Sequence, residues 1–260
     1  MKTSLLLLLL SLSILTSGCG GGESSPSPSS GNPITPIAVS NLAWDNARVY
    51  KPYSTSPSSV AELNSMPPGP VAISLHGCDG VNNTTDPNYF PLLLASFGYL
   101  VIEPDSYFGD KVGSFGSLLC DGFNIPQGAW ANMPNRVKDA EYAVAKVKAA
   151  PYWNQKTLLV QGQSQGAVVL ANFPSIEGAT KILWTGYNCP DTYLATSKAA
   201  LWLPTIPKLV VNSLEDPWGA GWSRCDSKYN WQIEIIPGSE HNPQRNPLGL
   251  KLITEFVKIY

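Results

Sequence analysis

The stretch VQGQSQGAVVL, residues 160–170, decides the fold because it places a serine between two glycines at a spacing of two. One apolar run ends at Val160, and a second apolar run follows the last glycine. Two local structures fit this pattern: an ordinary glycine-rich turn, or a strained strand-to-helix turn that lifts Ser164 above a sheet. Gly162 and Gly166 suit the strained turn, since glycine tolerates unusual backbone geometry and allows close packing.

The stretches around this turn predict an α/β fold. Short, almost continuous apolar runs alternate with helical stretches, as in a parallel sheet that is covered on both faces. The expected strands are residues 71–77, 99–106, 156–162, 181–186, 207–213 and 231–238, and the expected helices are residues 87–97, 134–149, 165–173 and 247–259. Residues 47–52 fit an antiparallel edge strand. We therefore predict a mostly parallel, doubly wound sheet without a large cap domain.

The helix expected at residues 134–149 has the clearest amphipathic pattern. One face would carry the apolar residues Val137, Ala140, Val144 and Val147, whereas the charged residues Lys138, Asp139 and Lys146 would point elsewhere. Arg136 lies at the start of this helix, close to Asp139. A structural polar network is therefore a better interpretation of Arg136 than a substrate-binding role, which remains the alternative for Arg136 and Asp105.

The N-terminal residues indicate export. A lysine at position 2 is followed by an apolar run from Leu5 to Leu15, which is too short to span a bilayer. Residues 1–18 resemble the signal peptide of a bacterial lipoprotein, with lipidation at Cys19, although ordinary cleavage nearby is the alternative. Residues 19–36 are rich in Gly, Ser and Pro and predict a flexible tether, which leaves residues 37–260 as one folded domain.

The expected location is the periplasmic side of a membrane, through a lipid anchor. By resemblance to bacterial sorting signals, Gly20 after Cys19 favours the outer membrane over the inner one. Without lipidation the protein would be secreted.

The chain has 17 basic and 19 acidic residues and no basic run, so nucleic acid is not expected as a partner. We expect a monomer.

Four cysteines follow Cys19, and an even number in an exported chain predicts two disulfides. We predict the pairs Cys78–Cys120 and Cys189–Cys225, because the loops that carry each pair would leave neighbouring strand ends. Four free thiols are the alternative. No two cysteines have the C-x-x-C spacing and the chain holds two histidines, so we expect neither a metal nor a cofactor.

A serine hydroxyl becomes a nucleophile when a base accepts its proton. The two histidines, His76 and His241, are the possible imidazole bases. The chain order serine, acid, histidine selects His241, in PGSEHNP just after the last expected strand. The acid should lie in NSLEDPWG, where we favour Asp216, with Glu215 as the alternative.

An acyl-transfer site also needs hydrogen-bond donors for the oxyanion of the tetrahedral intermediate. The backbone N–H of Gln165, the residue after the serine, would be one donor. The second would be the N–H of Cys78 in the loop LHGCDG, which leaves His76 a structural role. Four aromatic residues could line an apolar pocket near this site or could pack in the core: Trp184, Tyr187, Trp218 and Trp222.

The stretches LHGCDG, LASFGYLVIEPDSY, RVKDAEYAVAKVKAAP, VQGQSQGA and NSLEDPW, together with the late His241, resemble the dienelactone hydrolase family of α/β-hydrolases. The resemblance covers most of the chain from Val71 to His241. Ser164 stands where the enzymes that named the family have a cysteine. The resemblance therefore implies a serine esterase rather than an enzyme for dienelactone itself. The side chain of Gln165 would be a polar group lining the site.

The resulting functional prediction is a hydrolase of carboxylic esters. Ser164 would form an acyl-enzyme, assisted by His241 and Asp216, and the substrate would be a small-molecule or polymeric ester. A peptidase or amidase on the same three residues is one alternative, although peptidases of this fold usually carry an extra domain. A cell-surface protein that keeps the fold without catalysis is the other. The fold hosts many chemistries, so the resemblance does not name the ester.

Overall fold

The computed structural model describes residues 42–81, 85–108, 133–172, 176, 178–186, 205–216 and 232–259. The chain divides between Pro33 and Ile34, and all the described residues lie on the C-terminal side of that division. The predicted signal peptide, tether and domain start at residue 37 lie outside the described residues. In the described part of the chain, no helix is both long and apolar enough to cross a membrane.

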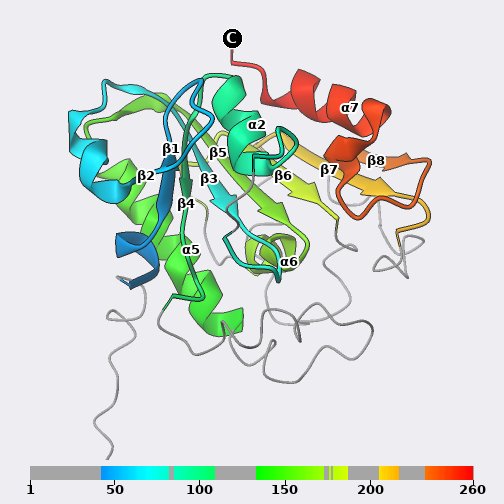
Figure 1. Ribbon diagram of the computed structural model, residues 1–260, viewed down its shortest axis with the longest axis horizontal. Coiled ribbons are helices and arrows are strands. Elements are labelled where there is room, and N and C mark those ends of the chain that lie inside the picture. The colour runs from blue at the N-terminus through cyan, green and yellow to red at the C-terminus, as the bar shows by residue number, and fades with distance from the viewer. Residues whose placement is uncertain are drawn as a thin grey trace, which may run out of the picture. The chain divides into compact units, whose positions relative to one another are not determined.

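The core of the protein is a mostly parallel sheet (Figure 1). Its strands in the described part are β1 (Arg48–Tyr50), β2 (Ser58–Ser59), β3 (Gly69–Leu75), β4 (Leu100–Glu103), β5 (Trp153–Gln163), β6 (Lys181–Thr185), β7 (Lys208–Ser213) and β8 (Gln232–Ile236). They lie side by side in the order β2-β1-β4-β3-β5-β6-β7-β8. Strands β3 to β8 pair in parallel, whereas β1 runs antiparallel to both β2 and β4.

The six predicted parallel strands and the four predicted helices are confirmed, with shifted ends. The helices are α2 (Phe90–Ser96), α5 (Met133–Lys148), α6 (Gln165–Ala171) and α7 (Pro247–Val257). The prediction that residues 47–52 form the edge strand is wrong in one respect. Strand β1 is antiparallel as expected, but β2 pairs with its outer side and forms the edge.

Apolar side chains cover both faces of the sheet, as the continuous apolar runs require. On one face, Ile73, Val160 and Ile182 pack with residues of α5 and α6. On the other face, Ala72, Leu159, Leu183 and other sheet residues pack with α2 and α7. The pairs of helices are visible on either side of the strands in Figure 1. This two-sided arrangement is the predicted doubly wound fold.

Helix α5 differs from its predicted pattern at one position. Asp139 is 2% exposed, so it does not point away from the buried face as expected. The neighbouring Arg136 is also buried, and its positive charge favours a buried carboxylate nearby. Because an α-helix has 3.6 residues per turn, Asp139 lies beside Arg136 on the helix surface. The pattern of apolar residues alone could not predict that this charged neighbour would bury Asp139.

The strand order places a topological switch point at β3. The chain passes from β3 to β4 on one side and later returns to β5 on the other side of β3. The loops that follow β3 and β5 therefore start from adjacent strand ends. In open α/β sheets, ligands bind in the crevice outside such a switch point.

Candidate active site

Ser164 occupies the strained turn that its sequence predicts. It lies between the last residue of β5 and the first residue of α6, with φ 53° and ψ −120°. A positive φ is rare for a residue with a side chain and costs roughly 1–3 kcal/mol. The backbone N–H of Ser164 donates to the carbonyl oxygen of Thr185 at 2.9 Å, which holds the turn against β6.

The two flanking glycines are required by close backbone contacts. A Cβ on Gly162 would lie 2.4 Å from the carbonyl oxygen of Gly166. A Cβ on Gly166 would lie 2.0 Å from the carbonyl oxygen of Leu75, at the end of β3. Both distances are far below van der Waals contact. The glycines therefore let the start of α6 sit directly against β5 and β3.

His241 and Asp216 form a hydrogen-bonded pair. Nδ1 of His241 lies 2.9 Å from Oδ2 of Asp216 and 3.2 Å from its Oδ1. The Asp216 side chain is buried, whereas the predicted alternative, Glu215, is exposed. Gly186 makes room for the histidine loop, because a Cβ there would lie 2.3 Å from the carbonyl oxygen of His241.

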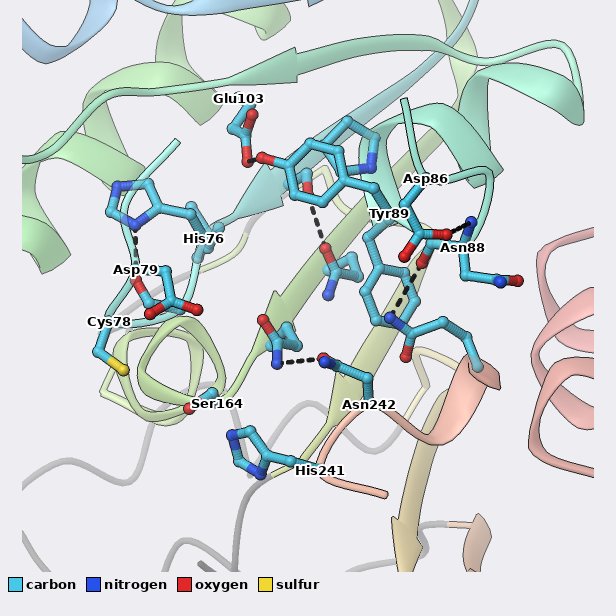
Figure 2. A pocket seen from close by; sticks show the side chains of 18 of the residues that line it. His76, Cys78, Asp79, Asp86, Asn88, Tyr89, Glu103, Ser164, His241 and Asn242 are labelled. Carbon is cyan, nitrogen blue, oxygen red and sulfur yellow. Dashed lines mark hydrogen bonds between the residues drawn. The ribbon is translucent and has the colours of Figure 1, made fainter. Parts of the chain in front are cut away.

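Ser164 and His241 line one cavity of about 400 Å³. Figure 2 shows both side chains at the same end of this cavity, close to Asn242. Oδ1 of Asn242 accepts a 2.6 Å hydrogen bond from Nε2 of Gln163. This bond joins the residue before Ser164 to the residue after His241, so it fixes the histidine loop relative to the strained turn.

The predicted oxyanion loop lies beside the serine. A Cβ on Gly77 would be 3.4 Å from Cβ of Ser164, and Cys78 lines the same cavity. Gln165 is the first residue of α6, so its N–H has no acceptor four residues earlier in that helix. Cys78 therefore lies in the same cavity as Ser164, and the use of the Cys78 and Gln165 N–H groups as oxyanion donors stays a prediction.

His76 is a buried, neutral residue below this loop. Its Nε2 accepts a 3.3 Å hydrogen bond from the N–H of Ser106, so the proton lies on Nδ1, which donates to the carbonyl oxygen of Gly77 at 2.8 Å. Burial, and next the nearby Arg136 charge, hold the pKa of His76 well below its usual value. His76 therefore supports the loop, as the sequence predicts.

Arg136 belongs to a polar network, as the sequence predicts, but its partners Tyr107 and Gln165 were not found from the sequence. The buried guanidinium of Arg136 donates to the His76 carbonyl oxygen at 2.5 Å and to Oε1 of Gln165. The hydroxyl of Tyr107 also donates to this Oε1, and Arg136 lies 5.1 Å from the centre of the Tyr107 ring. The expectation that the Gln165 side chain lines the site is therefore wrong, because it points into this network. The available signal for this network in the sequence was the polar side chain of Gln165 directly after Ser164.

The other predicted residues are only partly described. Trp184 lies in β6 with its side chain buried in the core, where Nε1 donates to the carbonyl oxygen of Ala167 at 3.1 Å. Tyr187, Trp218 and Trp222 lie outside the described residues. Cys78 is disulfide-bonded. The other predicted disulfide cysteines, Cys120, Cys189 and Cys225, and the predicted lipidation site, Cys19, lie outside the described residues, so the pairing and the anchor stay predictions.

Within the described ranges, no three His, Cys, Asp or Glu side chains are placed to hold a metal ion. The cavity that holds Ser164 is lined by amides, hydroxyls, carboxylates and loop backbone, and it contains His241, which is paired with Asp216. Such groups can activate a hydroxyl, transfer a proton and stabilise an oxyanion.

Solved structures share this architecture. A candidate dienelactone hydrolase from Klebsiella pneumoniae superposes with a TM-score of 0.53 at 15% identity, covering 75% of this chain and 88% of its own. Est1E from Butyrivibrio proteoclasticus gives 0.50 at 16% identity, covering 82% and 90%. The protein has the α/β-hydrolase fold. This α/β-hydrolase fold also matches a candidate dipeptidyl aminopeptidase IV from Bacteroides ovatus, with a TM-score of 0.52 at 16% identity.

The match to the Bacteroides protein covers 81% of this α/β-hydrolase chain but 33% of the other chain. No protein-family model matches the chain, and no curated protein sequence matches it. At these identities the comparisons establish the fold, and the activity has to be argued from the site.

Proposed function

We propose that the protein is a serine hydrolase of carboxylic esters, with Ser164 as nucleophile, His241 as general base and Asp216 as the acid that orients the base. One observation carries the proposal. Ser164 is held at a positive φ where a strand meets a helix, in a cavity that it shares with a paired histidine. Strain of this kind persists when the surrounding structure requires it, and it is concentrated at functional sites.

In the proposed reaction, Oγ of Ser164 attacks the ester carbonyl carbon while its proton passes to Nε2 of His241. The tetrahedral oxyanion accepts hydrogen bonds from the N–H groups of Cys78 and Gln165. The C–O bond to the alcohol then breaks, and His241 returns the proton to the leaving oxygen. Water, deprotonated by His241, attacks the acyl-enzyme and releases the acid and Ser164.

Asp216 acts on His241 rather than on the substrate. Its carboxylate accepts from Nδ1, which leaves Nε2 of the neutral imidazole available to accept the serine proton. It also stabilises the imidazolium that forms during the reaction. Gln163 and Asn242 support this arrangement through the hydrogen bond described above.

Removal of the Ser164 hydroxyl tests the proposal. The Ser164→Ala protein should lose nearly all hydrolysis of p-nitrophenyl acetate and p-nitrophenyl butyrate, by a factor of at least about 10³, and keep its melting temperature. Ser65→Ala is a matched control, because Ser65 is exposed and bonds only locally to the carbonyl oxygen of Glu62. Parental rates in the Ser164→Ala protein would contradict the proposal.

An amide substrate separates the alternative activity. A peptidase or amidase would turn over p-nitroacetanilide or peptide p-nitroanilides well above the uncatalysed rate, whereas the proposed esterase should turn over p-nitrophenyl esters and show no measurable turnover of these amides. The protein spans one third of the candidate dipeptidyl aminopeptidase IV that it matches, so that protein's activity carries no weight here.

A further inference from the structure

The cavity beside Ser164 has an unusually polar floor. On the face that packs against α2 and α7, three adjacent strands change from apolar to polar at the same level of the sheet. Val101 is followed two residues later by Glu103, Ala72 by Ser74, and Leu159 by Gln161. Successive residues at a spacing of two share one face of a strand. A row of polar side chains thus crosses the carboxyl ends of β4, β3 and β5.

These side chains line the cavity although they are buried in the protein. Glu103 is 1% exposed, Gln161 is 0% exposed and Gln244, from the short 3-10 helix η7 (Pro243–Arg245) before α7, is 4% exposed. Figure 2 shows Glu103 and Tyr89 at the opposite end of the cavity from Ser164 and His241. Burying polar groups costs free energy unless they are hydrogen-bonded. If these positions served packing alone, we would expect apolar residues there, as at the positions two residues earlier in the same strands.

Each of the three residues has one polar atom with a partner and one without. Glu103 accepts from the Tyr89 hydroxyl at Oε1, Gln161 accepts from Ser74 at Oε1, and Gln244 donates to the Asn88 carbonyl from Nε2. The remaining atoms, Oε2 of Glu103, Nε2 of Gln161 and Oε1 of Gln244, have no hydrogen-bond partner among the described residues. An unsatisfied buried polar atom destabilises the folded protein, and a ligand that forms a hydrogen bond with it removes that cost.

The three atoms have defined hydrogen-bonding roles. Nε2 of Gln161 is a donor and Oε1 of Gln244 is an acceptor. Burial raises the pKa of Glu103 to about 8, against the weaker effects of the Tyr89 hydrogen bond and the Arg48 charge. Glu103 is therefore protonated at neutral pH and, because Oε1 accepts from Tyr89, presents its O–H from Oε2. The set offers two donors and one acceptor, all uncharged.

This set fits neutral hydroxyl groups better than an anion or an alkyl chain. A hydroxyl both donates and accepts, so adjacent hydroxyls satisfy donors and acceptors together. Among the described lining residues the cation is Arg245, and its guanidinium is paired with Asp86 at 2.8 Å. An alkyl chain would leave all three buried atoms unsatisfied.

We propose that this cavity binds a polyhydroxylated, uncharged part of the ester substrate, such as a sugar or a hydroxylated ring, through Glu103, Gln161 and Gln244. The inference rests on the proposed esterase function and adds the substrate class. These residues contact the bound group away from the reacting bond, and they determine specificity rather than carry out the chemistry.

Two pairs of matched substrates test the proposal on the purified protein. The first pair is a methyl glucoside acetylated on its primary hydroxyl and cyclohexylmethyl acetate. In this pair the hydroxylated member carries its hydroxyls in the alcohol part of the ester. The second pair is methyl quinate and methyl cyclohexanecarboxylate. In this pair the hydroxylated member carries its hydroxyls in the acid part of the ester. We expect kcat/KM for the hydroxylated member of at least one pair to be higher by about tenfold or more, as a few hydrogen bonds of about 1 kcal/mol each require.

Variants then assign the preference to the three residues. Gln161→Met, Gln244→Met and Glu103→Met should each reduce the preference by about 3- to 10-fold, mainly through the KM of the hydroxylated substrate. Glu103→Gln keeps a donor in place of the carboxyl O–H and should keep the preference. Gln232→Met is the control, since Gln232 is exposed on β8 and bonds to Glu234.

The outcomes separate the two proposals. Activity on p-nitrophenyl acetate without a preference in either pair would overturn the hydroxyl-binding cavity and leave the esterase intact. A preference that survives all three methionine variants would overturn the assignment to these residues. Inactivity towards every ester, including p-nitrophenyl acetate, would overturn the esterase proposal and this inference with it.

Discussion

At the scale of single residues, buried polar side chains distinguish this site from the core around it. The sequence could select Ser164, His241 and Asp216 as candidates, because each residue type has a required position in the chain order of the proposed triad. It could not identify Glu103 or Gln161. A single polar residue in a strand can be recognised as buried only when the helices and loops that cover the strand are known. Arg136 was recognised as part of a polar network, but its contact with Gln165 depends on the packing of α5 against α6.

The first prediction concerns the carboxylate of Asp216, which is proposed to orient His241. Asp216→Asn should lower kcat by up to ~10⁴-fold, because an asparagine amide favours the wrong tautomer of His241. The rates are measured with p-nitrophenyl acetate under saturating conditions. Glu215→Gln is the matched control, since Glu215 is adjacent but exposed, and it should retain the parental rate. The reverse result would make Glu215 the acid.

Glu103 should give the protein a characteristic pH dependence of stability. Its pKa is raised to about 8 in the folded protein, whereas an unfolded carboxyl ionises near 4.5. Below pH 4.5 both states are protonated. Between pH 4.5 and 8 only the unfolded state ionises, so the free energy of unfolding falls as the pH rises, by at most about 1.4 kcal/mol per pH unit. Above pH 8 this fall ends.

Glu103→Gln removes that ionisation, while Asp105, whose pKa is raised by burial, still titrates in both proteins. The difference in the free energy of unfolding between Glu103→Gln and the parent should therefore grow in favour of the variant from pH 5 to pH 8. Urea unfolding at both pH values measures it. A difference that stays constant with pH would mean that Glu103 is ionised in the folded protein.

At the scale of elements, continuous apolar runs were enough to predict six strands and four helices. Strand β2 was missed because its two residues, Ser58 and Ser59, carry no apolar signal and pair only through the backbone of β1. Strand β5 begins earlier than expected, at Trp153, where exposed polar residues precede the apolar run. Backbone pairing without apolar side chains leaves little trace in a sequence.

The packing of α6 on β3 gives a prediction at this scale. Gly166→Ala should lower the free energy of unfolding by about 1–3 kcal/mol and reduce esterase activity, because the new methyl group would meet the Leu75 carbonyl oxygen at 2.0 Å. Gly69→Ala is the control, since the nearest atom to a Cβ there is 3.9 Å away. Thermal unfolding and p-nitrophenyl acetate assays compare them. Equal stability of both variants would contradict the described packing.

At the scale of the whole molecule, export and the pairing of the disulfide cysteines remain proposals from the sequence. We propose that Cys78 pairs with Cys120 and Cys189 with Cys225, which would brace the loops near the site. Peptide mapping without reduction should find these two links. A Cys78–Cys189 link, or free thiols at all four positions, would refute the pairing. Reduction should lower esterase activity before it unfolds the sheet, since Cys78 lines the cavity beside Ser164 and lies in the proposed oxyanion loop.

We also propose that a lipid on Cys19 anchors the protein to a membrane, with residues 19–36 as the tether. Metabolic labelling with a palmitate analogue should mark the parent and miss a Cys19→Ala variant. Equal labelling of the two proteins, or labelling of neither, would instead indicate an unanchored exported protein.

The central claim is that Ser164 is the nucleophile that becomes acylated. Its most direct test is mass spectrometry of the protein after treatment with a fluorophosphonate, which reacts covalently with activated serines. The account predicts one adduct, located on the peptide that contains Ser164, and no adduct in the Ser164→Ala and His241→Ala proteins. An adduct on another serine, or an equal adduct in the Ser164→Ala protein, would contradict it.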